Sequence, residues 1–262
     1  TAFAGSSWHA THVAALDVAS SGESLVQYGG SVEALTSAKT YTSVTNLTVT
    51  GTATDPLWVT TSGSGAITFT SCDGLEFTGC SDLRVPMTLI GSDATFTNCV
   101  SQHADGTTLP ASSSLVYCAG AAMTLDLVDC DFPYNAVAPS RVYFTKFGSN
   151  HKYEITASGC DFGTGLGGTS FGSTSTLSLT NCVMDESSGN SSGHAISFTA
   201  ATLATCVIDR FRLIGKAISL GAVGDFTLTN SYIGVKALAF SGYGISALAN
   251  RYTVTADTIE AI

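Results

Sequence analysis

The chain has 262 residues, 44% of them hydrophobic, and carries a formal net charge of −10. Its charged fraction of 11% is less than half of the ~25% found in typical soluble domains. Because an acidic surface repels phosphate groups, we expect no nucleic-acid partner, and no apolar run approaches the roughly 18–20 residues that a membrane span requires.

The first 41 residues do not share the sequence pattern of the rest of the chain. Two segments within them, residues 14–18 (AALDV) and 31–35 (SVEAL), are interpreted as short helical pieces or as a cap. A stack of strands needs such a cover, because its open edge otherwise pairs with other chains. We therefore predict an N-terminal cap or assembly segment over residues 1–41 and a single domain over residues 42–262.

Two short phrases alternate along residues 42–262. The first phrase ends in a small residue, with an apolar residue usually two places later. The small residues are Cys72, Cys99, Cys130, Cys160, Cys182, Cys206 and Ser231. The second phrase, AISF at 195–198, is nearly repeated at 217–220 and at 237–240. Two phrases that recur in the same order indicate one structural unit repeated along the chain.

Each repeat is predicted to be one coil of short strands whose alternating apolar residues point inward. Equivalent strands of successive coils lie about 4.8 Å apart, so chemically similar residues form ladders along the axis. The small residue suits a tight inward corner, and an Asn before it suits a bend with a left-handed backbone. The predicted ladder contains Cys99, Cys130, Cys160, Cys182, Cys206 and Ser231, preceded in three coils by Asn98, Asn181 and Asn230; Cys80 and Cys118 are expected to lie outside it.

This pattern resembles the right-handed parallel β-helix superfamily typified by pectate lyases and phage tailspikes, over about residues 42–256. The resemblance implies an all-β fold: a single-stranded, right-handed parallel β-helix with a non-repeating N-terminal cap. About eight coils would make it roughly 35–40 Å long. In that superfamily an Asn ladder lies in the turn between the second and third strands, which is the place implied for Asn98, Asn181 and Asn230.

The cysteines are predicted to be buried, free thiols. Side chains that point the same way from stacked strands do not easily reach the torsion of a disulfide bond. Free thiols favour folding in a reducing compartment.

Two pairs of acidic residues are expected to stack on neighbouring coils, with their carboxylates about 5 Å apart. Asp131 and Asp161 each follow a ladder cysteine directly, and Asp185 and Asp209 each come three places after one. Two carboxylates about 5–9 Å apart, one with a raised pKa, perform glycoside hydrolysis, and two close carboxylates also bind Ca²⁺. The simplest interpretation is a solvated surface that keeps the solenoid soluble.

A basic and aromatic cluster is centred on Arg141, Tyr143 and Lys146, with His151 and Lys152 nearby. Such groups stack on sugars or bind acidic glycans, although long cationic side chains also cover ordinary protein surface. In the lyases that the chain resembles, Arg or Lys removes the proton next to a carboxylate, and acidic residues on the strand face hold Ca²⁺. The matching positions here (197, 219 and 239) hold Ser and Ala.

We expect a non-enzymatic structural or adhesive solenoid of a virion appendage or of a microbial, extracellular surface assembly, with glycan contact through Arg141, Tyr143 and Lys146. It would need no cofactor and would assemble as a homotrimer or filament, or with other structural proteins. One alternative is a polysaccharide-active hydrolase or lyase that uses Asp185, Asp209 and Arg141. Another is a Ca²⁺-dependent carbohydrate-binding module in which Asp131 and Asp161 hold the ion.

Overall fold

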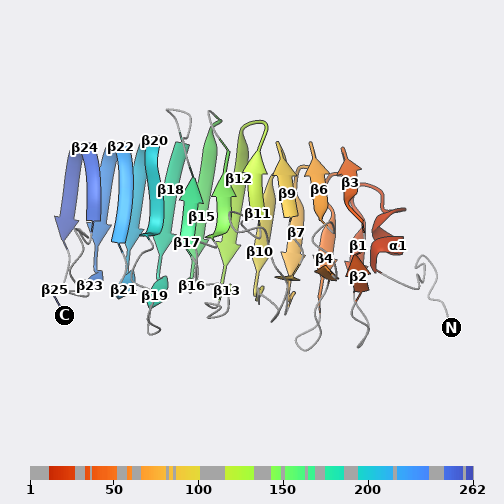
Figure 1. Cartoon of the computed structure of the whole chain (residues 1–262), viewed down its shortest axis with the longest axis horizontal. Coiled ribbons are helices and arrows are strands. Elements are labelled where there is room, and N and C mark those ends of the chain that lie inside the picture. The colour runs from red at the N-terminus through yellow and green to blue at the C-terminus, as the bar shows by residue number, and fades with distance from the viewer. Residues whose placement is uncertain are drawn as a thin grey trace.

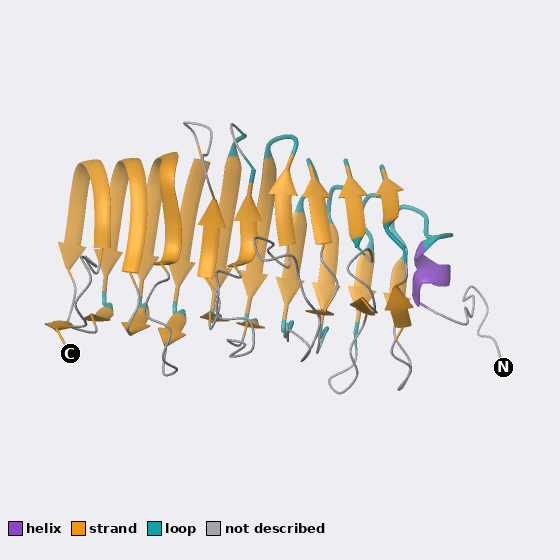
Figure 2. Cartoon of the chain, viewed as in Figure 1, coloured by secondary structure: helices purple, strands orange, loops and turns teal. Residues whose placement is uncertain are grey.

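The computed structural model of the chain is nearly all β-strand, and its paired strands run parallel (Figures 1 and 2). The structure describes residues 12–26, 33–35, 37–51, 58–60, 66–80, 83–84, 87–100, 116–132, 143–148, 151–162, 165–168, 175–185, 194–214, 217–235, 245–255 and 258–261. The chain passes repeatedly through three rows of stacked strands, so the architecture is a parallel β-solenoid. The helix His12–Leu16 and the strand Thr258–Ala261 lie at opposite ends of its long axis.

Among the described residues, each coil contributes a strand to the second row, and most coils also contribute one to each of the other two rows. The first row contains β3 (Lys39–Thr42), β6 (Ile67–Thr70), β9 (Met87–Ile90), β11 (Val116–Ala119), β14 (Tyr143–Phe147) and β17 (Gly165–Gly168). The second row contains β1 (Ser24–Val26), β4 (Thr48–Thr50), β7 (Leu75–Thr78), β10 (Ala94–Thr97), β12 (Met123–Val128), β15 (Tyr153–Ser158) and β18 (Ser175–Thr180). Three longer strands run through both rows: β20 (His194–Asp209), β22 (Ala217–Thr229) and β24 (Ile245–Thr255).

The third row consists of two sheets formed by the strands that follow the second row. The first sheet contains β2 (Glu33–Leu35), β5 (Trp58–Thr60) and β8 (Leu83–Arg84). The second contains β13 (Asp131–Phe132), β16 (Asp161–Phe162), β19 (Val183–Asp185), β21 (Arg212–Ile214), β23 (Tyr232–Val235) and β25 (Thr258–Ala261).

Apolar ladders fill the interior of the solenoid. Along β7, β10 and β12, buried residues alternate with partly exposed ones, as expected for strands with one face in a core. In-register stacking places like residues together: the rings of Phe77 and Phe96 stack at 4.8 Å, and those of Phe132 and Phe162 lie 5.5 Å apart. Hydrophobic burial along this axis stabilises every coil through its two neighbours.

The first described element is the helix α1 (His12–Leu16), whose Leu16 is buried. Asp17 follows the helix and accepts hydrogen bonds of 2.8 Å from Lys39 and from Tyr41 of β3, so it fastens the helix to the first coil. Strands β1, β2 and β3 pair with β4, β5 and β6. The described solenoid therefore starts at residue 24, before the predicted boundary at residue 42, and the segment 31–35 contributes a strand.

The turn from the second row to the third needs a left-handed backbone. The residue at this turn has a positive φ in each of seven coils: Gly79 (61°), Asn98 (51°), Asp129 (51°), Gly159 (66°), Asn181 (54°), Arg210 (50°) and Asn230 (49°). The conformation expected for the three asparagines is present. A side chain with a Cβ pays about 1–2 kcal/mol in this region, which Asn offsets in part and Gly avoids.

We predict that Asn98→Ala lowers the free energy of unfolding by about 1 kcal/mol, because alanine has no polar group that favours the left-handed turn. Asn98→Gly is the matched variant and should keep most of the stability. Urea unfolding followed by circular dichroism measures both. An equal loss in the two variants would mean that contacts of the Asn98 side chain, rather than its backbone conformation, matter here.

Candidate functional site

A ladder of buried thiols lies inside the corner between the second and third rows. Its members are Cys80, Cys99, Cys130, Cys160 and Cys182, and all five thiols are free. Each thiol donates a hydrogen bond of 3.3–3.8 Å to the carbonyl oxygen two residues earlier. The ladder side chain therefore satisfies a backbone acceptor at the point where the strand ends.

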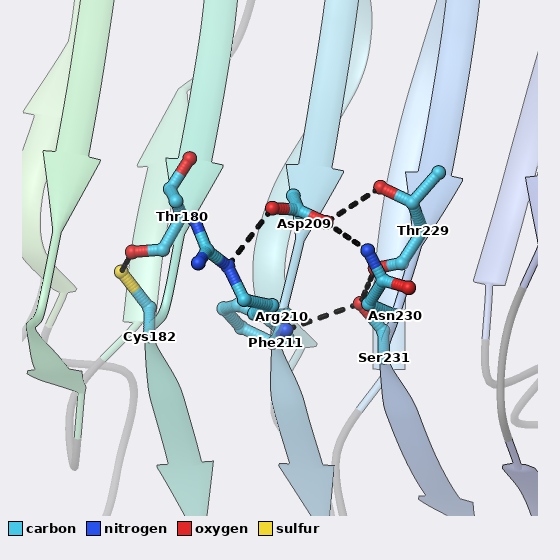
Figure 3. A network of polar contacts seen from close by, with 8 residues as sticks. All are labelled: Thr180, Cys182, Asp209, Arg210, Phe211, Thr229, Asn230 and Ser231. Atoms are coloured by element: carbon cyan, nitrogen blue, oxygen red, sulfur yellow. Dashed lines mark hydrogen bonds and ion pairs between the residues drawn. The ribbon is translucent and has the colours of Figure 1, made fainter.

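Phe211 and Ser231 continue this position in the next two coils. Their places follow from backbone hydrogen bonds between coils, in which Arg212 donates to the carbonyl of Cys182 and Tyr232 to that of Phe211. Ser231 donates to the carbonyl of Thr229 at 2.7 Å and accepts from the N–H of Phe211 at 3.1 Å (Figure 3). A hydroxyl thus performs the same structural task as a thiol.

The predicted place of Cys206 in this ladder is wrong. Cys206 lies within the second row, where its Cα is in register with Leu177 and Phe226. The corner of that coil is instead made by Arg210, with a φ of 50°, and by Phe211. Neither a cationic residue in a left-handed turn nor a large ring at a small-residue position is suggested by a repeat built on Asn and Cys.

Two other cysteines also differ from the sequence interpretation. Cys80, which was expected outside the ladder, is its first described member, since Val100 donates to the Cys80 carbonyl across the coils. Cys72 follows β6 and lies at the other corner, where the first row ends and its N–H donates to Ser92 at 2.9 Å. Cys118 lies in β11 and outside the ladder, as predicted.

Neighbouring ladder thiols shift one another's pKa. The adjacent thiols of Cys130 and Cys182 lower the pKa of the Cys160 thiol. The Cys160 thiol, together with burial, raises the pKa of Cys130 and of Cys182. Away from the ladder, burial raises the pKa of Cys206 to about 12 and also raises that of Cys118, so both are neutral thiols.

Asp209 is held in a network that joins two coils (Figure 3). Its carboxylate accepts hydrogen bonds from Thr229 at 2.7 Å and from Asn230 at 2.9 Å, and it pairs with Arg210 at 3.0 Å. The hydrogen bonds from Thr229 and Asn230, with the nearby cation, lower the pKa of Asp209. A general acid of a glycoside hydrolase needs the opposite shift.

Asp185 does not occupy a position equivalent to Asp209. Its Cα is in register with Ile214 in the third row, whereas Asp209 lies at the end of the second-row part of β20, beside Thr180. The predicted stacked pair is therefore wrong, because it was counted from Cys206 as a ladder residue. The side chain of Asp185 lies outside the described residues.

Asp131 and Asp161 do stack. They are register partners in β13 and β16, and both are exposed. Partial burial raises the pKa of Asp131. Within the described ranges, no group of three or more His, Cys, Asp or Glu side chains is arranged to hold a metal ion.

The basic cluster is only partly described. Arg141 and the side chains of Tyr143 and Lys146 lie outside the described residues, although the Lys146 backbone in β14 is in register with Tyr117, whose side chain is 37% exposed. Lys152 pairs with Glu154, and His151 packs against the edge of a tyrosine ring.

That ring belongs to Tyr153, which is buried. Its hydroxyl donates to the backbone carbonyls of Cys118 and Gly148 at 3.3 Å. Tyr153 is therefore part of the core and not a platform for a sugar.

Two columns of mostly short, polar side chains lie on the outward side of the second row, and we call them the threonine face. Two columns of register partners define it: Thr48, Glu76, Thr95, Asp126, Thr156, Ser178, Val207, Thr227 and Thr253, beside Thr50, Thr78, Thr97, Val128, Ser158, Thr180, Asp209, Thr229 and Thr255. These two columns contain no cationic or aromatic residue.

The acidic side chains of the threonine face accept hydrogen bonds from threonines of neighbouring coils. Thr48 donates to Glu76 at 3.2 Å, Thr156 donates to Asp126, and Thr229 donates to Asp209. These carboxylates therefore link one coil to the next.

Comparisons with models of protein families, with curated proteins and with solved structures found no match to this chain. Among the described residues, no helix has the length and apolar character needed to cross a membrane.

We predict that no thiol of the native protein reacts with a water-soluble aromatic disulfide reagent, and that all eight react after unfolding in urea. The reason is that all eight cysteines are buried and free. The absorbance of the released aromatic thiolate counts the reactive groups. Fewer than eight reactive groups in unfolded protein, prepared without reductant, would indicate disulfide bonds.

The Asp209→Ala variant should unfold at a lower urea concentration than the parent chain at pH 7. Because the folded pKa of Asp209 is lowered, its contribution is complete above the unfolded value of about 3.9 and is lost as the pH falls through the folded pKa. The difference between the two proteins should therefore shrink in acid. Asp73→Ala, which removes an exposed turn carboxylate, is the control, and an equal effect there would contradict a specific tie at Asp209.

Proposed function

We propose that the chain is a non-enzymatic structural or adhesive solenoid of a virion appendage or of a microbial surface assembly. The observation that carries this proposal concerns three outward acids of the threonine face. Glu76, Asp126 and Asp209 each accept a hydrogen bond from a threonine of an adjacent coil. Carboxylates engaged in this way stiffen the stack and are not available as an acid and base pair.

We further propose that the solenoid is right-handed, as the resemblance to pectate lyases and tailspikes implies and as parallel crossover connections favour. If each strand of the second row belongs to one turn, then β1, β4, β7, β10, β12, β15, β18, β20, β22 and β24 correspond to ten turns instead of about eight.

The threonine face is proposed as the surface for lateral assembly into a homotrimer or filament, or for contact with other structural proteins. Its side chains are short, and its strands are in register, so it presents an even surface along several coils. Glycan contact is assigned to the neighbouring first row, where Tyr117 is exposed beside the Lys146 backbone.

The rival proposals have less support. A hydrolase or lyase based on Asp185 and Asp209 would need these residues at equivalent positions, and their strands lie in different rows. A Ca²⁺-dependent carbohydrate-binding module keeps the stacked Asp131 and Asp161, but it would need a third ligand from outside the described residues.

Light scattering at increasing protein concentration tests the assembly. We expect trimers or larger species from the parent chain and a shift to monomers for Thr97→Arg, because a long cation at the centre of the threonine face prevents close lateral packing. Thr88→Arg, on the outward side of β9 in the first row, is the matched control and should assemble normally. Monomers at all concentrations from the parent chain would contradict the proposal.

Incubation with a panel of neutral and acidic polysaccharides tests the enzymatic rival. We expect neither new reducing ends nor the absorbance of unsaturated products. Activity that disappears in Asp209→Asn would replace our proposal with the hydrolase or lyase.

A further inference from the structure

The two ends of the solenoid are built differently. At one end the helix α1 lies against β1, and at the other end β24 and β25 are the outermost elements (Figure 1). Among the described residues, each of these two strands pairs on one side only, β24 with β22 and β25 with β23. The other side of β24 therefore presents backbone N–H and C=O groups without a described strand partner. Such an edge pairs readily with a further strand.

The α1 end is covered by residues 12–17, which we call the end cap. Leu16 is 2% exposed and packs into the apolar interior. Asp17 holds the cap to β3 through the hydrogen bonds from Lys39 and Tyr41. A helix of five residues is not stable by itself, so the cap stays in place through these contacts with the first coil.

One hydrogen-bonding pattern recurs between the coils of the second row. Outward-facing residues donate their N–H to the preceding coil, as Thr48 does to the carbonyl of Glu23. Inward-facing residues donate to the following coil, as Leu75 does to the carbonyl of Asp93. Each coil therefore offers the same set of donors and acceptors to the coil that follows it.

The same pattern makes the two ends of the solenoid complementary. Thr255 accepts from the N–H of Asn230 in the preceding coil, so the neighbouring residue Val254 directs its N–H toward the open side of β24. In β1, Ser24 and Val26 are register partners of outward-facing residues in β4, so their N–H groups point toward the α1 end. With the cap removed, β1 of a second copy matches the open side of β24.

The side chains of the two ends also match, column by column. In the threonine face, Thr253 of β24 would stack on Ser24 of a second copy, and Thr255 would stack on Val26, which is 44% exposed in the capped chain. These pairs bring no like charges together. An added coil also gives the last coil a second neighbour, and contacts between neighbouring coils are what stabilise a solenoid.

We propose that the end cap is a stop against end-to-end polymerisation, and that the partner it excludes is a second copy of this chain. When the cap is released, β1 of one copy adds to β24 of another as the next parallel strand. The two surfaces that meet are different, so the contact repeats and produces a filament one solenoid wide. This growth along the axis is separate from the lateral assembly proposed for the threonine face.

Releasing the cap tests this proposal. Leu16→Asp places a charge in the apolar interior and should detach the cap, whereas Val18→Asp is the matched control, because Val18 is 61% exposed. Both substitutions are made in the Thr97→Arg chain, to prevent lateral assembly. By electron microscopy we expect Leu16→Asp to form filaments one solenoid wide, with lengths in steps of roughly 50 Å for ten turns. Val18→Asp should remain monomeric.

A further substitution tests the β24 end. Val254→Pro removes the N–H on the open side of β24, a place where an edge strand tolerates proline. Added to Leu16→Asp, it should abolish the filaments. Circular dichroism verifies that each variant folds. If Leu16→Asp does not fold, Asp17→Ala replaces it, because this variant loses both hydrogen bonds to β3 and should form shorter filaments of the same width.

Three results would overturn the proposal: only monomers from a folded chain with a released cap, equal filaments from Val18→Asp, or filaments that persist with Val254→Pro. The failure of lateral assembly looks different. In that case Thr97→Arg leaves the particles of the parent chain unchanged in width, whereas loss of the end stop changes length alone.

Discussion

The stacking of parallel strands in register is the constraint on which the rest of the structure depends. It places each residue directly between its equivalents in the coils before and after, at about 4.8 Å. A residue type is therefore tolerated only if it is compatible with its own neighbours in the ladder. Inside the solenoid this produces continuous apolar columns, such as the stacked rings of Phe77 and Phe96.

The same constraint explains how charge is distributed on the threonine face. Like charges directly opposite each other on adjacent strands are destabilising. Glu76, Asp126 and Asp209 are each flanked by threonines in register, so every one of these carboxylates has a hydroxyl nearby instead of a second acid. Asp131 and Asp161 in the third row show the contrast, because they are exposed and stack directly on each other without a threonine between them.

Much of the fold could be predicted because the turn chemistry repeats. Asn98, Asn181 and Asn230 stand where the backbone is left-handed, and cysteines follow two of them in the adjoining corner. The register of the later coils could not be predicted, because the coil after Cys182 replaces Asn and Cys by Arg210 and Phe211. Local phrases identify a coil, but the pairing of backbone groups between coils decides which residues are equivalent.

The errors at the candidate site have the same origin. Asp185 and Asp209 each lie three residues after a cysteine in the sequence. The two cysteines are not equivalent, however, because Cys182 lies at a corner and Cys206 lies within a strand. A stacked acid pair needs equal positions in two coils, and equal counts along the chain do not provide this when loops differ in length.

Burial reconciles free thiols with the location at a virion or cell surface that we propose. Thiol chemistry proceeds through the exposed thiolate, whereas the eight cysteines here are 0–2% exposed. In the ladder, moreover, each sulfur is engaged with a backbone carbonyl, and parallel side chains do not readily reach the disulfide torsion. Packing and geometry are therefore sufficient to keep these cysteines free. Their free state does not by itself identify the redox state of the compartment in which the protein acts.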